Sequence, residues 1–286
     1  MNIPGSDVYL NGEWLPRGEA RVSAFDRGFI FGDGIYEVIP VYNRKPFLMD
    51  RHLERMVDNL AKVKIPDPHG GVEGWAKLVQ ALVDRQAFEN QKLYIQITRG
   101  AAPRLHSFPD KAEPTVFMFT DEMMILSDER AKEGFKGVTM PDFRWLRGDI
   151  KSISLLAAVL GSEHARQHDA TELIFIREGI VTEGASSNVL ICKDGQLSSP
   201  VTDRRILPGV TVSLAEEVAA KVGMPVEHRD IAEGELRAAD EVMITSSGKE
   251  IVAIVSLDGK PVGDGKSGPA FAKLWDGYRE ASGVRG

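Results

Sequence analysis

The first 120 residues alternate between two apolar periodicities, one typical of strands and one typical of amphipathic helices. Asn11-Gly12 supplies the two positive φ angles of a tight turn, so the residues around it predict a β-hairpin. A second hairpin is predicted over 35–49, around Asn43-Arg44. Two helices and about four strands form a complete small α+β layer. The remaining elements predicted in this half are helices over 53–60 and 72–82 and strands over 92–98 and 114–120.

The segment 121–134 loses this apolar pattern and gains acidic residues, so we predict an interdomain linker there. It separates a small α+β domain, 1–120, from a larger domain, 135–286. The same periodicity arguments predict that the larger domain contains helices over 152–168, 210–222 and 269–281, and strands near 173–176, 189–192, 242–245 and 251–255.

Composition narrows the class of protein. With 35 basic and 42 acidic residues the formal net charge is −7, and no basic run is long enough to follow a phosphate backbone. We therefore expect that the protein has no nucleic-acid partner and that its partners are small molecules. Cys192 is the single cysteine, which excludes an intrachain disulfide and fits a reducing compartment. No leader is evident at the amino terminus, and the longest apolar run, 155–160, is too short to cross a bilayer. These features predict a cytoplasmic protein without membrane contact.

Lys151 precedes the long apolar helix predicted from 152, which should carry it toward the interior. Burial disfavours a charged ammonium, and a neutral amine is what condensation with an aldehyde cofactor requires. Glu183 lies in a polar, small-residue loop, 181–188, between two predicted strands. A carboxylate facing a pyridine nitrogen keeps that nitrogen protonated, which makes the ring an electron sink. Each residue also has an ordinary structural interpretation: a surface lysine at a helix start, and a solvated turn.

Three further segments have the chemistry of a phosphate site. Val210 and Thr211 open a predicted helix, where backbone N–H groups favour an anion. Ser246-Ser247 follows a strand and offers further donors, and Arg55 offers positive charge from a helix. Thr211 is equally compatible with an ordinary first helical turn, and Arg55 with a solvated helix face. His164 and His168 are one helical turn apart but lack the order of a zinc protease motif, so we expect no metal.

Together these segments resemble the class IV (fold-type IV) aminotransferases, which depend on pyridoxal 5′-phosphate (PLP), and D-amino-acid transaminases in particular. The resemblance runs over nearly the whole chain. The matching motifs are Asp26-Arg27-Gly28-x-x-Phe31-Gly32-Asp33-Gly34-x-Tyr36-Glu37-Val38, Thr98-Arg99-Gly100-x-x-Pro103-Arg104-x-His106, Trp145-Leu146-Arg147-x-Asp149-Ile150-Lys151-Ser152 and Val181-Thr182-Glu183-Gly184.

The resemblance implies a role for each matching residue. Lys151 would be the catalytic Schiff-base lysine, and Glu183 the partner of the pyridine nitrogen. Tyr36, Arg104 and His106 would bind the substrate α-carboxylate, with Arg104 and His106 on a loop near the partner subunit's site in a homodimer. The remaining cofactor contacts implied are the phosphate ligands Arg55, Val210, Thr211 and Ser247, Leu207 behind the ring, and Ser246 at a lesser position.

The resemblance also implies a fold and an activity. The fold is two-domain α+β, with a small α+β domain, a larger pseudo-barrel domain and PLP in the cleft between them. The activity is transfer of an amino group from a D-amino acid, such as D-alanine or D-glutamate, to 2-oxoglutarate or pyruvate. The sequence departs from relatives at Gly148, Ala185 and Gly248, where they often carry Cys, Ser and Thr, and we expect altered cofactor affinity from these changes.

Other activities of the same fold are alternatives at this point. They are a branched-chain L-amino-acid or (R)-amine transaminase, an aminodeoxychorismate-type lyase, and a non-catalytic PLP-binding dimer. Branched-chain enzymes and the lyases lack the Arg-x-His loop. The pair Arg104 and His106 therefore carries the prediction of D-specificity.

Overall fold

The structure, a computed structural model, describes residues 7–284. Residues 1–6, which contain most of the stretch judged to lack a leader, lie outside it. The described chain divides into two compact units. Unit 1 comprises residues 7–125 and 150–154, and unit 2 comprises 126–149 and 155–284. Within the described range no helix combines the length and apolarity needed to cross a membrane.

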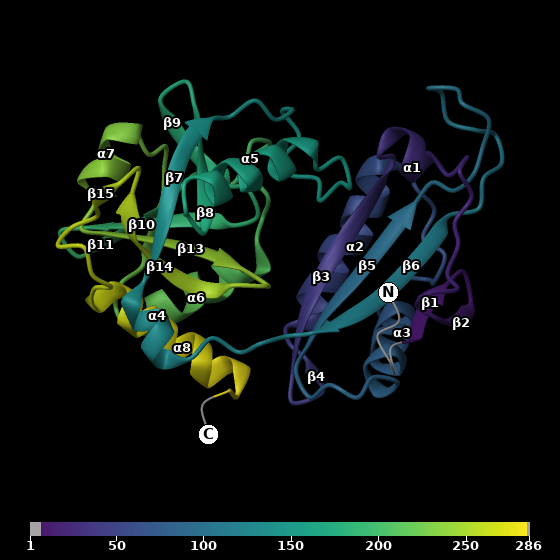
Figure 1. Cartoon of the computed structure of the whole chain (residues 1–286), viewed down its shortest axis with the longest axis horizontal. Coiled ribbons are helices and arrows are strands. Elements are labelled where there is room, and N and C mark those ends of the chain that lie inside the picture. Colours follow the sequence, from purple (N-terminus) through teal and green to yellow (C-terminus); the bar gives the residue numbers. More distant parts are fainter. Residues whose placement is uncertain (1–6, 285–286) are drawn as a thin grey trace. The chain divides into compact units, whose positions relative to one another are not determined.

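Unit 1 is a six-stranded antiparallel sheet covered by two helices. Its elements are β1 (Asp7–Leu10), β2 (Glu13–Pro16), α1 (Arg27–Phe31), β3 (Gly34–Tyr42), β4 (Lys45–Pro46), α2 (Met49–Val63), α3 (Val72–Asp84), β5 (Gln91–Thr98) and β6 (Thr115–Glu122). The strand order is β2-β1-β6-β5-β3-β4. Figure 1 shows α2 and α3 on the same face of this sheet, and their apolar stripes pack against Ile35, Ile39 and Ile95 to form the core.

Unit 2 is built on a nine-stranded mixed sheet. Its elements are α4 (Asp128–Glu133), β7 (Phe135–Pro141), α5 (Leu156–Gln167), β8 (Glu172–Arg177), β9 (Ile180–Gly184), β10 (Asn188–Lys193), β11 (Gln196–Ser199), α6 (Val210–Lys221), β12 (Val226–His228), α7 (Glu233–Ala238), β13 (Glu241–Ser246), β14 (Glu250–Leu257), β15 (Lys260–Pro261) and α8 (Pro269–Ser282). The order is β12-β11-β10-β13-β14-β7-β8-β9, with β15 paired to β14. In Figure 1, β7 and β8 run across the direction of β13 and β14, so the sheet is strongly curved. The α+β fold class is confirmed.

Both predicted hairpins and all the predicted long helices of unit 1 are confirmed. The segment predicted as a linker, 121–134, holds the end of β6 and all of α4. Two predictions about local structure are wrong. Glu183 lies within strand β9 and not in a loop. The helix expected from residue 152 begins only at Leu156, because 150–154 instead pairs with unit 1. Whether 121–134 acts as a linker between domains stays a prediction.

The first turn of α8 depends on a side chain from another element. Glu241, at the start of β13, is buried and accepts hydrogen bonds from the N–H groups of Ala270 and Phe271, both at 2.8 Å. Gly268 precedes the helix, and a Cβ there would come within 2.3 Å of the Glu241 carboxyl carbon. The carboxylate therefore caps a helix whose own N-cap residue has no side chain to do so.

We expect Glu241→Gln to lower the free energy of unfolding by about 1–2 kcal/mol, because an NH2 group replaces one of the two accepting oxygens and the amide carries no charge for the helix dipole. Urea unfolding followed by fluorescence of Trp275, which is buried in α8, measures the change. Glu280→Gln, at an exposed position on the same helix, is the matched control. An equal loss in both variants would contradict the capping role.

Candidate active site

Lys151 is fixed by its backbone to β3 and α2. Its carbonyl accepts from the Tyr36 N–H at 3.0 Å, and its own N–H donates to the Asn59 side chain at 3.0 Å. The neighbouring Ile153 N–H donates to the Gly34 carbonyl. A Cβ at Gly34 would lie 2.5 Å from the Ile97 carbonyl oxygen. Only glycine therefore allows β3 to approach β5 this closely at Gly34. Lys151 is half-buried, and its Nζ lies 4.2 Å from the centre of the Tyr36 ring.

Unit 1 also buries a carboxylate, that of Glu37. Glu37 shares the core face of β3 with Ile35 and Ile39, and its side chain is fully covered. Arg55 donates to it through Nη2 at 2.6 Å and Nε at 3.0 Å, and His52 Nδ1 lies at 3.1 Å. Burial raises the pKa of Glu37, but the charges of Arg55 and His52 outweigh it and hold the pKa far below its ordinary value.

Glu37 and His52 were not among the predicted site residues, although a signal was present. An acid between two isoleucines at alternate positions of a strand is a charge placed at a core position. The pKa of His52 is lowered chiefly by burial, against the pull of Glu37. The guanidinium of Arg55, predicted to bind phosphate, is oriented by Glu37.

The opposite face of β3 presents aromatic rings beside Lys151. Tyr36 stacks on Tyr94 of β5 with ring centres 5.7 Å apart, and Tyr94 contacts Phe119 of β6. Burial and the neighbouring Tyr36 raise the pKa of Tyr94 to about 12, so its hydroxyl stays protonated and donates to Gln96 at 2.8 Å. This row places stacked aromatic rings next to the lysine amine.

Arg104 and His106 lie on the irregular, exposed segment that follows β5. Both side chains contact Phe31 of α1: the His106 ring centre lies 5.3 Å from the Phe31 ring centre, and the Arg104 guanidinium carbon lies 5.4 Å from it. The structure therefore brings these two predicted carboxylate-binding residues together on one aromatic ring. Tyr36 lies elsewhere in the same unit, on β3.

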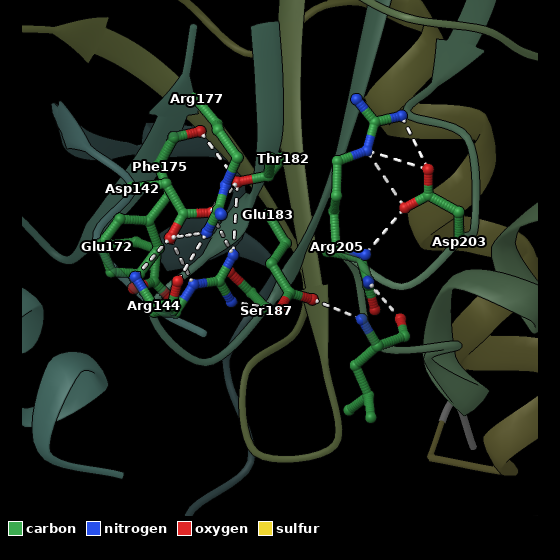
Figure 2. Close-up of polar contacts among 12 residues, drawn as sticks. Asp142, Arg144, Glu172, Phe175, Arg177, Thr182, Glu183, Ser187, Asp203 and Arg205 are labelled. Atoms are coloured by element: carbon green, nitrogen blue, oxygen red, sulfur yellow. Dashed lines mark hydrogen bonds and ion pairs between the residues drawn. The ribbon is translucent and has the colours of Figure 1, made fainter. Parts of the chain in front are cut away.

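In unit 2, Glu183 is held by an arginine and a backbone amide. Arg144 Nη1 donates to Glu183 Oε1, and the Leu207 N–H donates to Oε2 at 2.9 Å (Figure 2). Leu207, predicted to pack behind the cofactor ring, is thus held through its N–H group by Glu183. Arg144 was not among the predicted site residues. The sequence signal that could have found it is its position directly before the Trp145-Leu146-Arg147 motif.

Asp142 orients Arg144 in turn, as Figure 2 shows. The Asp142 side chain is fully covered and accepts from Arg144 Nε at 2.9 Å and Nη2 at 2.8 Å, from Arg177 at 3.0 Å and from the Thr182 hydroxyl at 2.9 Å. Burial raises the pKa of Asp142, but the Arg144 hydrogen bonds and charge lower it to about 2. Burial lowers the pKa of Arg144, and its two carboxylates raise it above the ordinary value. These contacts favour the charged forms of Asp142 and Arg144.

The predicted phosphate segments of unit 2 meet through Asn188. Its side chain donates to the Leu207 carbonyl at 2.8 Å, and its backbone pairs with Thr245, next to Ser246 and Ser247. Val210 and Thr211 are buried at the start of α6, and the N-cap residue, Gly209, has no side chain to cap that start. Ser246 Oγ accepts from the Lys249 N–H in the turn between β13 and β14. The N–H groups at the start of α6 and the hydroxyls of Thr211, Ser246 and Ser247 are donors of the kind that bind a phosphate group.

The three departures from relatives have different surroundings. A Cβ at Gly148 would lie 2.4 Å from the Arg205 carbonyl oxygen, so the 204–206 backbone lies where a larger side chain would be. Ala185 packs with Leu173 and Phe175. Gly248 is exposed in the turn after Ser247. Elsewhere, the His164 and His168 rings lie 4.2 Å apart on α5, and the described chain shows no group of three or more His, Cys, Asp or Glu residues arranged for a metal.

Comparison with known proteins supplies the family. The family model Amino-transferase class IV matches residues 34–257. A D-alanine aminotransferase from Staphylococcus aureus (strain MW2) is 40% identical over 274 residues, which is 96% of each chain, and one from Listeria innocua is 38% identical over 279 residues, covering 96% and 95%. A solved branched-chain amino acid aminotransferase from T.th., with pyridoxamine 5′-phosphate, has a TM-score of 0.90 at 22% identity, over 98% of this chain and 95% of that one. The chain therefore belongs to the class IV amino-transferases.

Proposed function

We propose that the protein is a PLP-dependent D-amino-acid transaminase that moves an amino group from a D-amino acid, such as D-alanine or D-glutamate, to 2-oxoglutarate or pyruvate. The observation that carries this proposal is identity of 38–40% to D-alanine aminotransferases over 96% of the chain. Family membership supports the reaction class, and the solved relative with pyridoxamine 5′-phosphate supports the cofactor. When bound, PLP supplies an electron-withdrawing ring that stabilises the negative charge formed when the substrate loses its α-proton.

In this proposal Lys151 would hold the cofactor covalently, and its amine would move the proton at the substrate Cα. Its backbone bonds to Tyr36 and Asn59 limit the reach of the amine, and the Tyr36 ring lies under it. Such positioning matters because proton transfer depends on a narrow range of distance and angle.

Glu183 is the proposed partner of the pyridine nitrogen, because Arg144 and the Leu207 N–H both favour its ionised form. Val210, Thr211, Ser246 and Ser247 are the proposed phosphate ligands, and Leu207 the proposed packing residue behind the ring. Arg55 is proposed as a charged phosphate ligand whose orientation Glu37 fixes. Tyr36, Arg104 and His106 are proposed to bind the substrate carboxylate by hydrogen bonds and charge.

The purified protein is expected to be yellow, and D-alanine should bleach the absorbance of the lysine-bound cofactor. Lys151→Ala should lack the absorbance of the lysine-bound cofactor, because the covalent link is lost. Its transamination rate should fall at least about 10³-fold, because the proton-transfer group is lost as well. Lys136→Ala, which removes an exposed lysine paired with Asp169, should stay yellow and active. A yellow, active Lys151→Ala variant would overturn the proposal.

A substrate panel separates the alternatives in the same assay. D-alanine and D-glutamate should convert the cofactor, while L-leucine and (R)-1-phenylethylamine should leave its spectrum unchanged. Conversion by L-leucine alone would indicate a branched-chain enzyme, and conversion by (R)-1-phenylethylamine alone an amine transaminase. Pyruvate release from aminodeoxychorismate would indicate the lyase. No change with any of these would indicate a non-catalytic PLP-binding protein.

Asp142 provides a pH test of the Arg144 and Glu183 arrangement. Its folded-state pKa of about 2 lies below the ordinary 3.8, so the stability it contributes is present above about pH 4 and is lost as pH falls through 2. We expect the stability advantage of the wild type over Asp142→Asn to shrink by about 1–2 kcal/mol between about pH 5 and pH 2. Urea unfolding at several pH values measures this, with exposed Glu178→Gln of the same unit as control. A pH-independent difference would refute the assignment.

We further propose that the protein is a cytoplasmic homodimer. The single cysteine supports a reducing compartment. An exposed apolar stripe on α5 supports self-association: Leu156, Val159 and Leu160 fall at i, i+3 and i+4 and are 72%, 59% and 52% exposed. Apolar side chains aligned on one helix face are typical of an interface between subunits.

Leu160→Glu should weaken the dimer at least about tenfold, because a charge would replace a leucine that the proposed interface covers in each subunit. Sedimentation velocity across a concentration series measures the dissociation constant. Met124→Glu, at an even more exposed apolar residue in unit 1, is the matched control and should leave the dimer unchanged. A wild-type monomer, or equal effects of the two substitutions, would contradict the proposal.

A further inference from the structure

Arg27 and Asp33 are charged residues of the first family motif to which the proposed function gives no role. Arg27 opens α1 and is 3% exposed. Asp33 lies between α1 and β3, and its side chain is 16% exposed. Arg99, from the second motif, is also buried and pairs with the same aspartate. All three belong to unit 1. Two buried arginines and the half-buried aspartate that they share, all at motif positions, require a physical reason.

Asp33 joins the two arginines. Its Oδ2 accepts from Arg27 Nε at 2.7 Å and from Arg99 Nε at 2.8 Å, and its Oδ1 accepts from Arg99 Nη2 at 3.0 Å. Burial raises the pKa of Asp33, but the hydrogen bonds and charges of Arg99 and Arg27 lower it below the ordinary value. Arg99 is anchored further on the carbonyls of Val63 and Lys64 at the end of α2, both at 2.8 Å. The triad is therefore rigid.

The triad holds the backbone of the segment that carries Arg104 and His106. Arg27 Nη1 donates to the Leu105 carbonyl at 2.6 Å and to the Ser107 carbonyl at 3.4 Å, and Nη2 donates to the His106 carbonyl at 3.4 Å. The Arg99 guanidinium lies 3.7 Å from the centre of the Phe108 ring. One buried guanidinium thus binds three consecutive peptide carbonyls of an exposed, irregular segment.

Phe31 completes the arrangement from the same helix as Arg27. The Arg27 guanidinium lies 4.9 Å from its ring centre, and Arg104 and His106 contact the same ring. Arg27 therefore fixes both the backbone of residues 105–107 and the ring against which the two side chains lie. A segment with neither helix nor strand pairing depends on such contacts for a defined conformation.

We propose that Arg27 is a positioning residue for the substrate carboxylate, which acts through Arg104 and His106 and is supported by Asp33 and Arg99. This inference rests on the proposed function. It assigns Arg27 and Asp33 of the first motif to substrate selection and not to the cofactor. Loss of Arg27 should therefore weaken recognition of the carboxylate while the cofactor stays bound.

Arg27→Lys tests the proposal, because one ammonium retains the charge beside Asp33 but cannot also bind the three carbonyls. We expect KM for D-alanine to rise roughly tenfold, with kcat within about twofold and an unchanged cofactor spectrum. Arg44→Lys is the matched control: Arg44 also donates to backbone carbonyls of unit 1, those of Gln86 and Val83, remote from the segment. It should leave KM unchanged.

A double-mutant cycle with Arg104→Gln distinguishes positioning from general loss of structure. If Arg27 acts through Arg104, Arg27→Lys should raise KM little further in the Arg104→Gln background. The preference for D-alanine over D-alaninamide, which lacks the carboxylate, should fall in Arg27→Lys as in Arg104→Gln. Additive effects, or an unchanged preference for D-alanine, would overturn the inference.

Phe108→Leu covers the case in which Arg27→Lys does not fold. Phe108 is 54% exposed, and its removal takes away only the ring under Arg99, so a smaller rise in KM of about threefold is expected. An unchanged KM in that variant would count against the proposal. If wild-type protein itself gives no spectral change with D-alanine, the proposed function fails; if wild type responds and the variants match it, only this inference fails.

Discussion

The backbone pairing of residues 150–154 with β3 is the contact on which the rest of the site depends. These five residues belong to unit 1, although the chain on either side of them belongs to unit 2. The Tyr36 N–H donates to the Lys151 carbonyl, and the Ile153 N–H donates to the Gly34 carbonyl. Strand alternation then puts Tyr36 beside the lysine and Glu37 on the core face. A single register error would exchange the two faces and remove both.

Each unit stabilises buried carboxylates with arginines rather than leaving them exposed. Glu37 is held by Arg55, Asp33 by Arg27 and Arg99, and Asp142 by Arg144 and Arg177. Burying such pairs costs desolvation energy that apolar residues of similar size would not incur, so their stability contribution alone does not explain them. Their effect is geometric, because a guanidinium bound on two edges has few rotamers left. Fixed charges aimed at a substrate or cofactor need no reorganisation when the reaction occurs.

The sequence predicted those parts of the fold that depend on local pattern. The Asn11-Gly12 hairpin and the helices with long apolar stripes were found because turn chemistry and periodicity lie within a few residues. β7 and β9 were missed: β7 contains Gly137 and ends in proline, and β9 carries polar residues whose partners come from distant segments. Likewise, Glu37 bonds to a residue 18 positions away and Arg144 to one 39 positions away, distances at which a local pattern gives no signal.

Substrate choice and fold are separable in this architecture. A solved protein with 22% identity has the same fold over nearly its whole length and is a branched-chain amino acid aminotransferase, so the fold alone does not determine the substrate. In this chain the proposed carboxylate-binding pair lies on an exposed segment outside the hydrophobic core of unit 1. Changing such a segment costs little core packing, provided that a rigid support holds whatever replaces it. The Arg27, Asp33 and Arg99 triad has that property, because two of its three members are anchored on main-chain carbonyls and the third joins them.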